Sequence, residues 1–248
     1  MNPLDILISS DLTKLQIGLP WQPEQRAVFT IPQFYGGTGD EDGFLIDQTL
    51  VWKPSEQPDC EATVSLDVPK EQTGIEFHGK LGLPKPGELL IRMKLKNVSD
   101  HIIEEGHHTM MLKLPVDAGY DDPEGKQTFL HADIGWISLA DLCARMELKS
   151  LHLPIRVGSN FNGLTVIWNL IARVFPKQGY AIAIGLDRSN GYAFASDHPD
   201  WGTGLLAGFR WGALMKPGES REAWMRMYFL PGGLEPVHQR FFKDRRER

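Results

Sequence analysis

The sequence contains little cysteine and no long hydrophobic run, and each absence excludes a class of protein. Two cysteines among 248 residues are too few for the disulfide framework of small secreted domains. No apolar stretch reaches the roughly 20 residues of a transmembrane helix, and Met1–Asp5 lacks the basic and apolar segments of a signal peptide. The sequence therefore predicts a cytoplasmic protein with reduced thiols and no membrane partner.

Positive charge is also scarce. The 26 Lys and Arg are outnumbered by 32 Asp and Glu, which gives a net charge of -6. Nucleic-acid binding depends on basic side chains that neutralise phosphates, so the composition argues against a nucleic-acid partner. The basic cluster at the C-terminal end, Lys243–Arg248, is typical of a frayed, solubilising tail.

A long linker and an internal repeat are absent as well. The chain length allows one large all-β domain or two small ones, and without a linker we expect a single domain over residues 1–248. Hydrophobic residues make up 42% of the chain and charged residues 23%, as in ordinary globular proteins. A chain of this length buries a substantial core.

Short segments with a period of two fill the sequence. In Ile91–Lys96 apolar and basic residues alternate, as in a strand with one buried face. Further strands are predicted at residues 5–8, 14–19, 27–31, 44–53, 62–68, 75–77, 107–114, 151–157, 164–172, 180–186, 192–195, 205–214 and 221–230. Many short strands and few helices predict an all-β fold, a large antiparallel β-sandwich.

Two short helices accompany the predicted strands. Ser138 is a plausible cap for a helix over Leu139–Glu147. A second helix is expected from about residue 234, after Gly233, and it would cover an edge or an open face of a sheet. The run Gly36–Gly43 lacks the Lys-Ser/Thr pair of a phosphate-binding loop and carries three acidic residues, so we interpret it as a mobile loop.

We predict a hairpin over Leu95–Pro115 and interpret it as the central element of the fold. Asn97–Asp100 supplies turn residues whose side chains can bond their own backbone. The strand that follows begins with His107 and His108. A period of two puts His108 on the apolar face with Met110, and His107 on the mixed face.

These residues resemble a segment of the aldose 1-epimerase (galactose mutarotase-like) superfamily. Lys96–Asp100 matches the family's Asn-x-Ser/Thr-Asp-like turn, and Gly106–His108 matches the Gly-x-His entry to its sugar site, although Met110 and Met111 replace an aromatic pair. Leu214–Ser220 resembles the family's Leu-x-Pro-Gly-Glu-Thr turn, which precedes a final strand. The resemblance implies a galactose mutarotase-like supersandwich that acts on a sugar, as an epimerase (an isomerase) without a cofactor.

Mutarotation requires an acid at the ring oxygen and a base at the anomeric hydroxyl, and a His and a carboxylate can fill these roles near neutral pH. The resemblance assigns the sugar-site histidine to His108, and His131 is the candidate for a second one. The family's base is a glutamate upstream of the Pro-Gly-Glu turn, but Ala195–Trp201, the corresponding window, contains none. The base is then absent or is replaced by Asp197, His198 or Asp200.

Aromatic faces stack on the apolar faces of sugars, which makes loop tryptophans candidates for contact with a sugar or oligosaccharide. The candidate substrate-binding residues are His107, Trp136, Asp200, Trp201 and Arg210. Arg210 would bond sugar hydroxyls or a uronate carboxylate. Exposed sandwich edges are compatible with a homodimer.

Two alternatives stay open at the level of sequence. The missing glutamate favours a non-catalytic carbohydrate-binding module on the same fold. A metal-dependent polysaccharide lyase or hydrolase is the other, with a cupin-like barrel as the associated fold alternative, and it would use a divalent transition metal. No H-x-H or H-x-x-x-H spacing supports it, and its candidate ligands are a carboxylate with His107, His108, His131 and His198.

Overall fold

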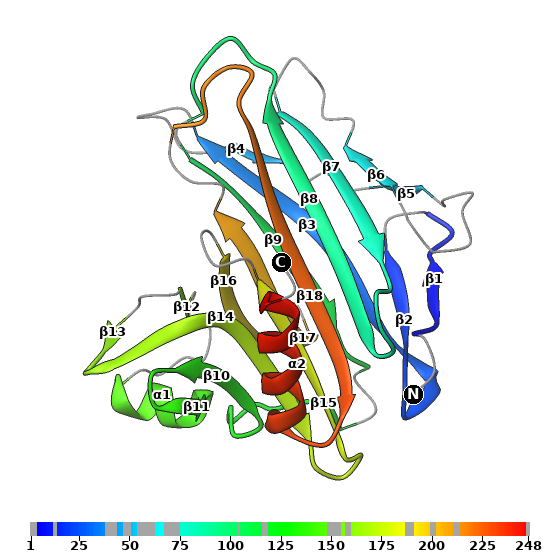
Figure 1. Ribbon diagram of the computed structural model, residues 1–248, viewed down its shortest axis with the longest axis vertical. Helices are drawn as coiled ribbons and strands as arrows, with labels where there is room; N and C mark the ends of the chain where they lie inside the picture. The colour runs from blue at the N-terminus through cyan, green and yellow to red at the C-terminus, as the bar shows by residue number, and fades with distance from the viewer. Residues whose placement is uncertain are drawn as a thin grey trace.

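Antiparallel strands dominate the protein and form two sheets (Figure 1). The computed structural model describes residues 4–11, 14–37, 44–46, 51–53, 63–66, 75–103, 105–115, 119–147, 155–156, 160–186, 191–198, 202–210 and 214–246. The two sheets pack face to face around a shared apolar core, so the predicted all-β sandwich is confirmed.

The first sheet, sheet A, contains eight strands within the described residues, in the order β1-β2-β3-β9-β17-β16-β12, with β4 paired to β3. Its strands are β1 (Ile6–Ile8), β2 (Leu15–Leu19), β3 (Gln22–Gly37), β4 (Phe44–Ile46), β9 (Glu105–Lys113), β12 (Ile155–Arg156), β16 (Gly191–His198) and β17 (Gly202–Arg210). The strand β9 lies between β3 and β17, near the middle of the sheet.

The second sheet, sheet B, has ten strands in the described part of the chain, in the order β11-β10-β14-β15-β18-β8-β7-β6-β5, with β13 paired to β14. Its strands are β5 (Val51–Lys53), β6 (Thr63–Leu66), β7 (Ile75–Gly82), β8 (Glu88–Asn97), β10 (Thr128–Ala132), β11 (Gly135–Ser138), β13 (Asn160–Phe161), β14 (Leu164–Phe175), β15 (Tyr180–Leu186) and β18 (Ser220–Pro231). The long strand β18 pairs with β8 on one side and with β15 on the other.

Alternating residues of both sheets fill the space between them. On β8 the apolar positions are buried, whereas Arg92 and Lys94 between them are exposed, as the period of two predicts. Each fully buried aliphatic or aromatic side chain contributes on the order of 1.5–3 kcal/mol. Core residues from the central strands include Leu89, Ile91, Met93, Leu95, Met110, Leu112, Leu205, Ala207, Met225, Met227 and Phe229.

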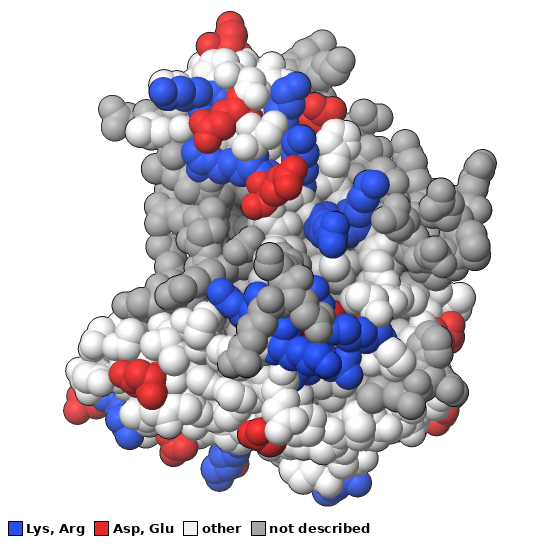
Figure 2. All heavy atoms as spheres, viewed as in Figure 1, with Lys and Arg blue, Asp and Glu red and all other residues white. Residues whose placement is uncertain are grey.

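Two helices flank the sheets. The helix α1 (Leu139–Arg145) is capped by Ser138, whose Oγ accepts a hydrogen bond of 3.0 Å from the Asp141 amide, which confirms the predicted cap. The helix α2 (Leu234–Arg246) lies on the outer face of sheet B (Figure 1). Phe241 approaches β15 where Gly185 has no side chain, since a Cβ there would lie 2.6 Å from the Phe241 ring. Lys and Arg side chains gather around α2 and over β8 and β18 (Figure 2).

Four local predictions were wrong. The segment predicted as a hairpin, Leu95–Pro115, instead connects the two sheets, because β8 pairs within sheet B and β9 within sheet A. The strand predicted at 27–31 continues through Gly36 and Gly37, which pair with β9, because a neighbouring strand supplies the hydrogen-bond partners; residues 38–43 lie outside the described part. The single strand predicted over 44–53 is replaced by β4 and β5, which lie in different sheets. The basic tail is helical through Arg246, and its Asp244 is only 2% exposed.

Candidate functional site

The two turns that carry the family resemblance contact each other. The Asn97 amide nitrogen Nδ2 donates to the backbone oxygens of His101 and Met215, both at 2.9 Å. The Asn97 backbone is bonded to the second turn as well, since it accepts from Gly218 N at 2.8 Å and donates to Glu219 O at 3.0 Å. Asn97 is fully buried, so these bonds satisfy a side chain that has no access to water.

Each turn is also closed internally. The Ser99 amide and hydroxyl donate to Asn97 Oδ1 at 3.0 and 2.6 Å, which confirms the expected side-chain-to-backbone turn. In the second turn, Glu219 accepts from the Lys216 amide and from Arg221 Nε, both at 2.9 Å. The backbone bonds to Lys216 and then the ion pair with Arg221 lower the pKa of the Glu219 carboxyl. The two turns are therefore joined to each other next to the chain segment that leads into β9.

Strand register brings several predicted site residues together at this end of β9. His107 is the Cα partner of Tyr35 on β3 and of Arg210 on β17. His108 is the partner of Phe34 and Phe209 on the same two strands. The rows Tyr35–His107–Arg210 and Phe34–His108–Phe209 thus place two histidines, an arginine and aromatic residues at adjacent positions across three strands.

The two faces of β9 have different surroundings along the described length of the strand. Met110 and Leu112 belong to the core between the sheets, whereas Met111 is buried outside that core. By the period of two, His108 shares the side of Met110 and His107 shares the side of Met111. The side chains of both histidines lie outside the described residues, so their orientation stays a prediction.

Asp197 and His198 lie at the opposite end of sheet A. Both belong to β16, and they pair with Thr203 and Gly202 at the start of β17. Thr203 precedes Arg210 by seven residues, which is about 23 Å along the strand at roughly 3.3 Å per residue. The structure therefore does not bring Asp197 and His198 to the histidines of β9. Asp200 and Trp201 fall outside the described residues.

His131 and Trp136 lie elsewhere again, on the outer face of sheet B under α2. The His131 ring stacks on His238 of α2 with a centroid distance of 5.1 Å and an interplanar angle of 16°, and it meets the edges of Trp136 and Phe242. His131 is 7% exposed, and its Nδ1 has no hydrogen-bond partner among the described residues. Burial, and then the neighbouring His238, lower the pKa of His131 to about 4.

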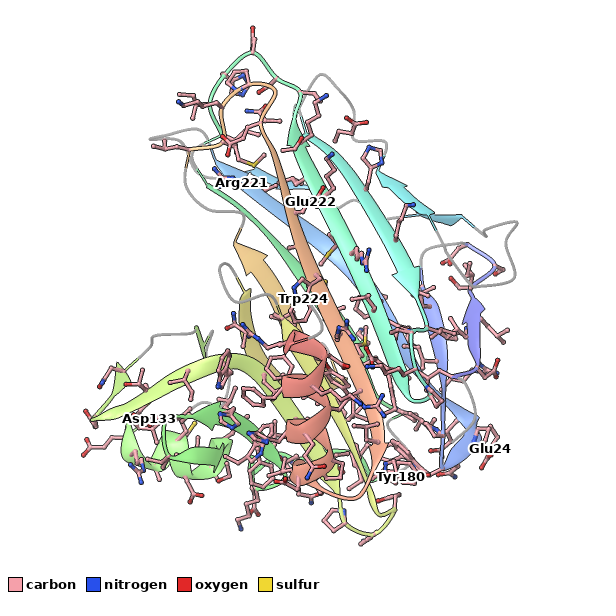
Figure 3. All side chains as sticks on the ribbon, in the orientation of Figure 1. Glu24, Asp133, Tyr180, Arg221, Glu222 and Trp224 are labelled. Atoms are coloured by element: carbon pink, nitrogen blue, oxygen red, sulfur yellow. The ribbon has the colours of Figure 1, made fainter. Side chains whose placement is uncertain are left out.

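The carboxylate beside His131 in the sequence does not pair with it. Asp133 lies in the turn between β10 and β11, near one end of sheet B (Figure 3), and its carboxylate accepts from the Thr165 amide at 3.3 Å. His131 is therefore held neutral near pH 7 in a cluster of rings. Its surroundings are those of a packed core histidine.

The four histidines considered as metal ligands do not share one place in the fold. His107 and His108 lie at one end of sheet A, His198 lies at the other end, and His131 lies under the helix on sheet B. Among the described residues, no group of three or more His, Cys, Asp or Glu is arranged to hold a metal ion.

Two aromatic neighbours of the histidines were missed by sequence reasoning. Phe34 and Tyr35 precede Gly36, and the glycine run suggested that the strand had already ended. Aromatic residues are common in strands, and this pair was a signal that β3 continues. Their position beside β9 depends on a register shift in β3 between Thr30 and Gln33, which no sequence pattern specifies.

Comparison with known proteins supports the architecture. No family model matches the chain, and no curated protein matches it. Among solved structures, an aldose epimerase homologue from C. elegans aligns with a TM-score of 0.55 at 10% identity, covering 93% of this chain and 97% of that one. The chain has the galactose mutarotase-like fold.

Two longer proteins also align with the chain over part of their own length. An α-N-acetylgalactosaminidase from Bifidobacterium bifidum aligns with a TM-score of 0.58 at 11% identity, over 99% of this chain and 38% of that one. A polysaccharide lyase aligns with a TM-score of 0.52 at 12% identity, over 96% of this chain and 34% of the lyase. The chain thus spans little more than a third of these two proteins. No helix in the described part is long and apolar enough to cross a membrane.

Proposed function

We propose that the protein binds a sugar at the start of β9 and acts on it as an epimerase or mutarotase. The observation that carries the proposal is the cross-strand row in which His108 lies between Phe34 and Phe209; by the period of two, the row of Tyr35, His107 and Arg210 is expected on the other face of the sheet. Imidazole and guanidinium groups bond sugar hydroxyls, and aromatic rings stack on the apolar faces of sugars. The names of the structural neighbours, an aldose epimerase homologue, a glycosidase and a polysaccharide lyase, support a carbohydrate as the substrate class.

The chemistry that this proposal assigns to His108 is proton transfer. His108 donates a proton to the ring oxygen while a base removes the proton of the anomeric hydroxyl, and the bond between the anomeric carbon and the ring oxygen breaks. Rotation of the open-chain aldehyde and closure from its other face give the other anomer. An imidazole with a pKa near neutrality serves both directions.

The test is NMR exchange between α and β anomers for a panel of free aldoses and uronic acids. We expect catalysed exchange in the native protein and a loss of about 10²–10⁴-fold in His108→Ala. His107→Ala reports whether the other side of β9 takes part. The matched control is His101→Ala, since His101 lies in the connection between β8 and β9 but is exposed and pairs with Asp100. Unchanged exchange in His108→Ala would refute the assignment.

A non-catalytic carbohydrate-binding module on the same fold is the second candidate. It is favoured by the separation of about 23 Å along β17 between Arg210 and the position paired with Asp197, since a sugar ring cannot contact both. Saturable sugar binding without anomeric exchange would support it over the first. Under the epimerase proposal we expect Asp197→Asn to keep full activity.

A further inference from the structure

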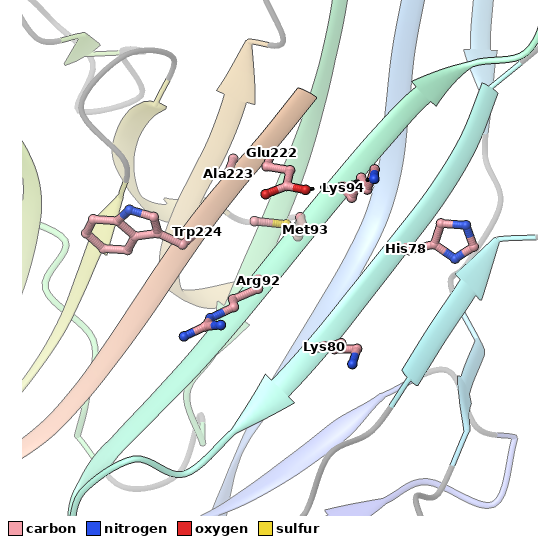
Figure 4. Close-up of a pocket in the computed structure, with 8 residues that line it drawn as sticks. All are labelled: His78, Lys80, Arg92, Met93, Lys94, Glu222, Ala223 and Trp224. Atoms are coloured by element: carbon pink, nitrogen blue, oxygen red, sulfur yellow. Dashed lines mark ion pairs between the residues drawn. The ribbon is translucent and has the colours of Figure 1, made fainter. Parts of the chain in front are cut away.

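A groove opens on the outer face of sheet B (Figure 4). Its volume is about 630 Å³, within the range of about 300–1,000 Å³ typical of ligand sites. The strands β7, β8 and β18 form its floor. The groove is lined by His78, Lys80, Arg92, Met93, Lys94, Glu222, Ala223 and Trp224.

Strand register arranges the polar lining as a grid. Lys80, Arg92 and Trp224 are partners in one row across the three strands. The next row, two residues along each strand, consists of His78, Lys94 and Glu222. Neighbouring strands lie about 4.8 Å apart and the rows about 7 Å apart, so both rows present side chains on one face within reach of a single ligand.

The lining is basic in a protein that is acidic as a whole. Three cations and one carboxylate line the groove, whereas the net charge of the chain is -6. Lys94 and Glu222 pair at 3.9 Å with side chains 50% and 77% exposed, a geometry of little energetic worth. Arg92 has no ion pair within the part of the chain that the structure describes. A cleft with one sign of charge concentrates ligands of the opposite sign.

An aromatic ring stands next to these cations. Trp224 is half-buried and packs against the apolar cluster under α2, and the guanidinium carbon of Arg226 lies 5.9 Å from the centroid of its ring. In Figure 4, Arg92 extends from β8 toward the strand that carries Trp224. Indole faces stack on the C–H faces of sugars, and a guanidinium binds a carboxylate through two parallel hydrogen bonds.

We propose that this groove is a second carbohydrate site, which binds an acidic oligosaccharide that contains uronate units. Arg92 binds a uronate carboxylate, Trp224 stacks on the sugar ring, and Glu222 accepts hydrogen bonds from hydroxyls. The site lies on the opposite sheet from His107 and His108, so it goes beyond the proposed sugar chemistry and does not depend on it.

A nucleic acid fits the groove less well. Single-stranded nucleic acids are bound by several aromatic platforms along a basic channel, and Trp224 is the one Trp, Tyr or Phe in the lining. Glu222 would repel a phosphate backbone, whereas a sugar hydroxyl donates to a carboxylate.

The test is the dissociation constant of a short oligogalacturonate, measured by calorimetry. The control ligand is the same oligosaccharide with its carboxyl groups reduced to alcohols. We expect Arg92→Ala and Trp224→Leu each to weaken oligogalacturonate binding by about tenfold or more. Lys177→Ala is the charge-matched control, since Lys177 is exposed in the turn between β14 and β15, and melting temperatures establish that each variant is folded.

Three results would overturn the proposal: equal binding of the reduced oligosaccharide, unchanged binding in Arg92→Ala, or tighter binding of a sulfated oligosaccharide or single-stranded DNA than of the uronate. His108→Ala separates the two sites. Under both proposals it loses anomeric exchange and keeps oligogalacturonate binding, whereas failure of anomeric exchange in the native protein would leave the groove's binding test intact.

Discussion

The outer face of sheet B has two regions in which charged side chains have opposite surroundings, buried in one and exposed to solvent in the other. Both regions are formed in part by β8 and β18. In the region covered by α2, Glu88 is fully buried and Arg226 is 9% exposed. In the open region, four to six residues along β8, Arg92 and Lys94 are exposed. Charged side chains on this face are thus either paired with each other beneath a helix or exposed to water in a groove.

The covered region satisfies its charges with a network that also holds the helix. Arg226 pairs with Glu88 and, at 3.2 Å, with Asp244 of α2. Lys85 pairs with Asp244 at 2.5 Å, and the Tyr228 hydroxyl donates to Asp244 at 3.4 Å. Burial raises the pKa of Glu88, an effect that Arg226 opposes, and burial raises the pKa of Tyr228. The network thus joins α2 to β8 and β18, and removing a member leaves buried charges without compensation.

The largest expected effect is therefore in the covered region. Arg226→Met leaves the buried carboxylates of Glu88 and Asp244 without their shared cation, and we expect the free energy of unfolding to fall by about 3–5 kcal/mol. Urea denaturation measures it. A loss below about 1 kcal/mol would mean that the covered charges behave like surface charges, which would remove the contrast between the regions.

A pH effect of intermediate size should also arise under the helix. The pKa of His131 is lowered to about 4 by burial and then by His238, whereas an unfolded histidine has a pKa near 6.5. Between these values the unfolded state binds the proton and the folded state does not, so stability falls as pH decreases from about 6.5 to about 4, by roughly 2–3 kcal/mol. Denaturation curves across this range measure the slope. It should persist in His101→Ala, and its persistence in His131→Phe would assign it to another group.

The close contact between α2 and β15 gives a smaller effect. In Gly185→Ala the new Cβ would lie 2.6 Å from the Phe241 ring, and relieving that overlap displaces the helix at a cost of about 1–3 kcal/mol. Gly82→Ala is the matched control, since a Cβ there has nothing within 4 Å and it lies on β7 of the same sheet. Equal melting temperatures for the two variants would contradict the close packing of α2.

The smallest effect on stability is expected in the open region. Arg92→Ala and Lys94→Ala remove exposed charges, so the free energy of unfolding should change by no more than about 0.5 kcal/mol. Comparing these changes in the free energy of unfolding with that of Arg226→Met tests whether the groove cations are dispensable for the fold, as expected of residues that serve ligand binding. A destabilisation above about 1.5 kcal/mol in Arg92→Ala would show that the groove is part of the structural framework.

Local patterns in the sequence were sufficient for most elements of the fold. The alternation in Ile91–Lys96, the Ser138 cap and the apolar spacing after residue 234 each predicted an element that the structure contains. These signals are local, because side-chain periodicity and capping depend on residues within a turn or two of each other. The sequence also predicted the Asn97 turn and its place before a histidine-bearing strand.

The candidate site was predicted only in part. The sequence named His107, His108 and Arg210, and β9 and β17 hold them at adjacent positions. It also named Asp197, His198 and His131 as candidate catalytic residues, whereas pairing puts the first two at the far end of sheet A and His131 lies beneath α2. It also gave no indication of the rows Lys80–Arg92–Trp224 and His78–Lys94–Glu222.

The sequence by itself determined the strands, their buried faces and the two turns, because each depends on a pattern within one short segment. Tertiary structure decided which strands are neighbours, in which register they pair, and which half of the outer face of sheet B the helix covers. These choices join residues far apart in the chain: Asn97 to Met215, Glu88 to Arg226, Arg92 to Trp224. Strand order and register depend on packing and hydrogen-bond pairing across the whole sandwich, so no local sequence pattern predicts them.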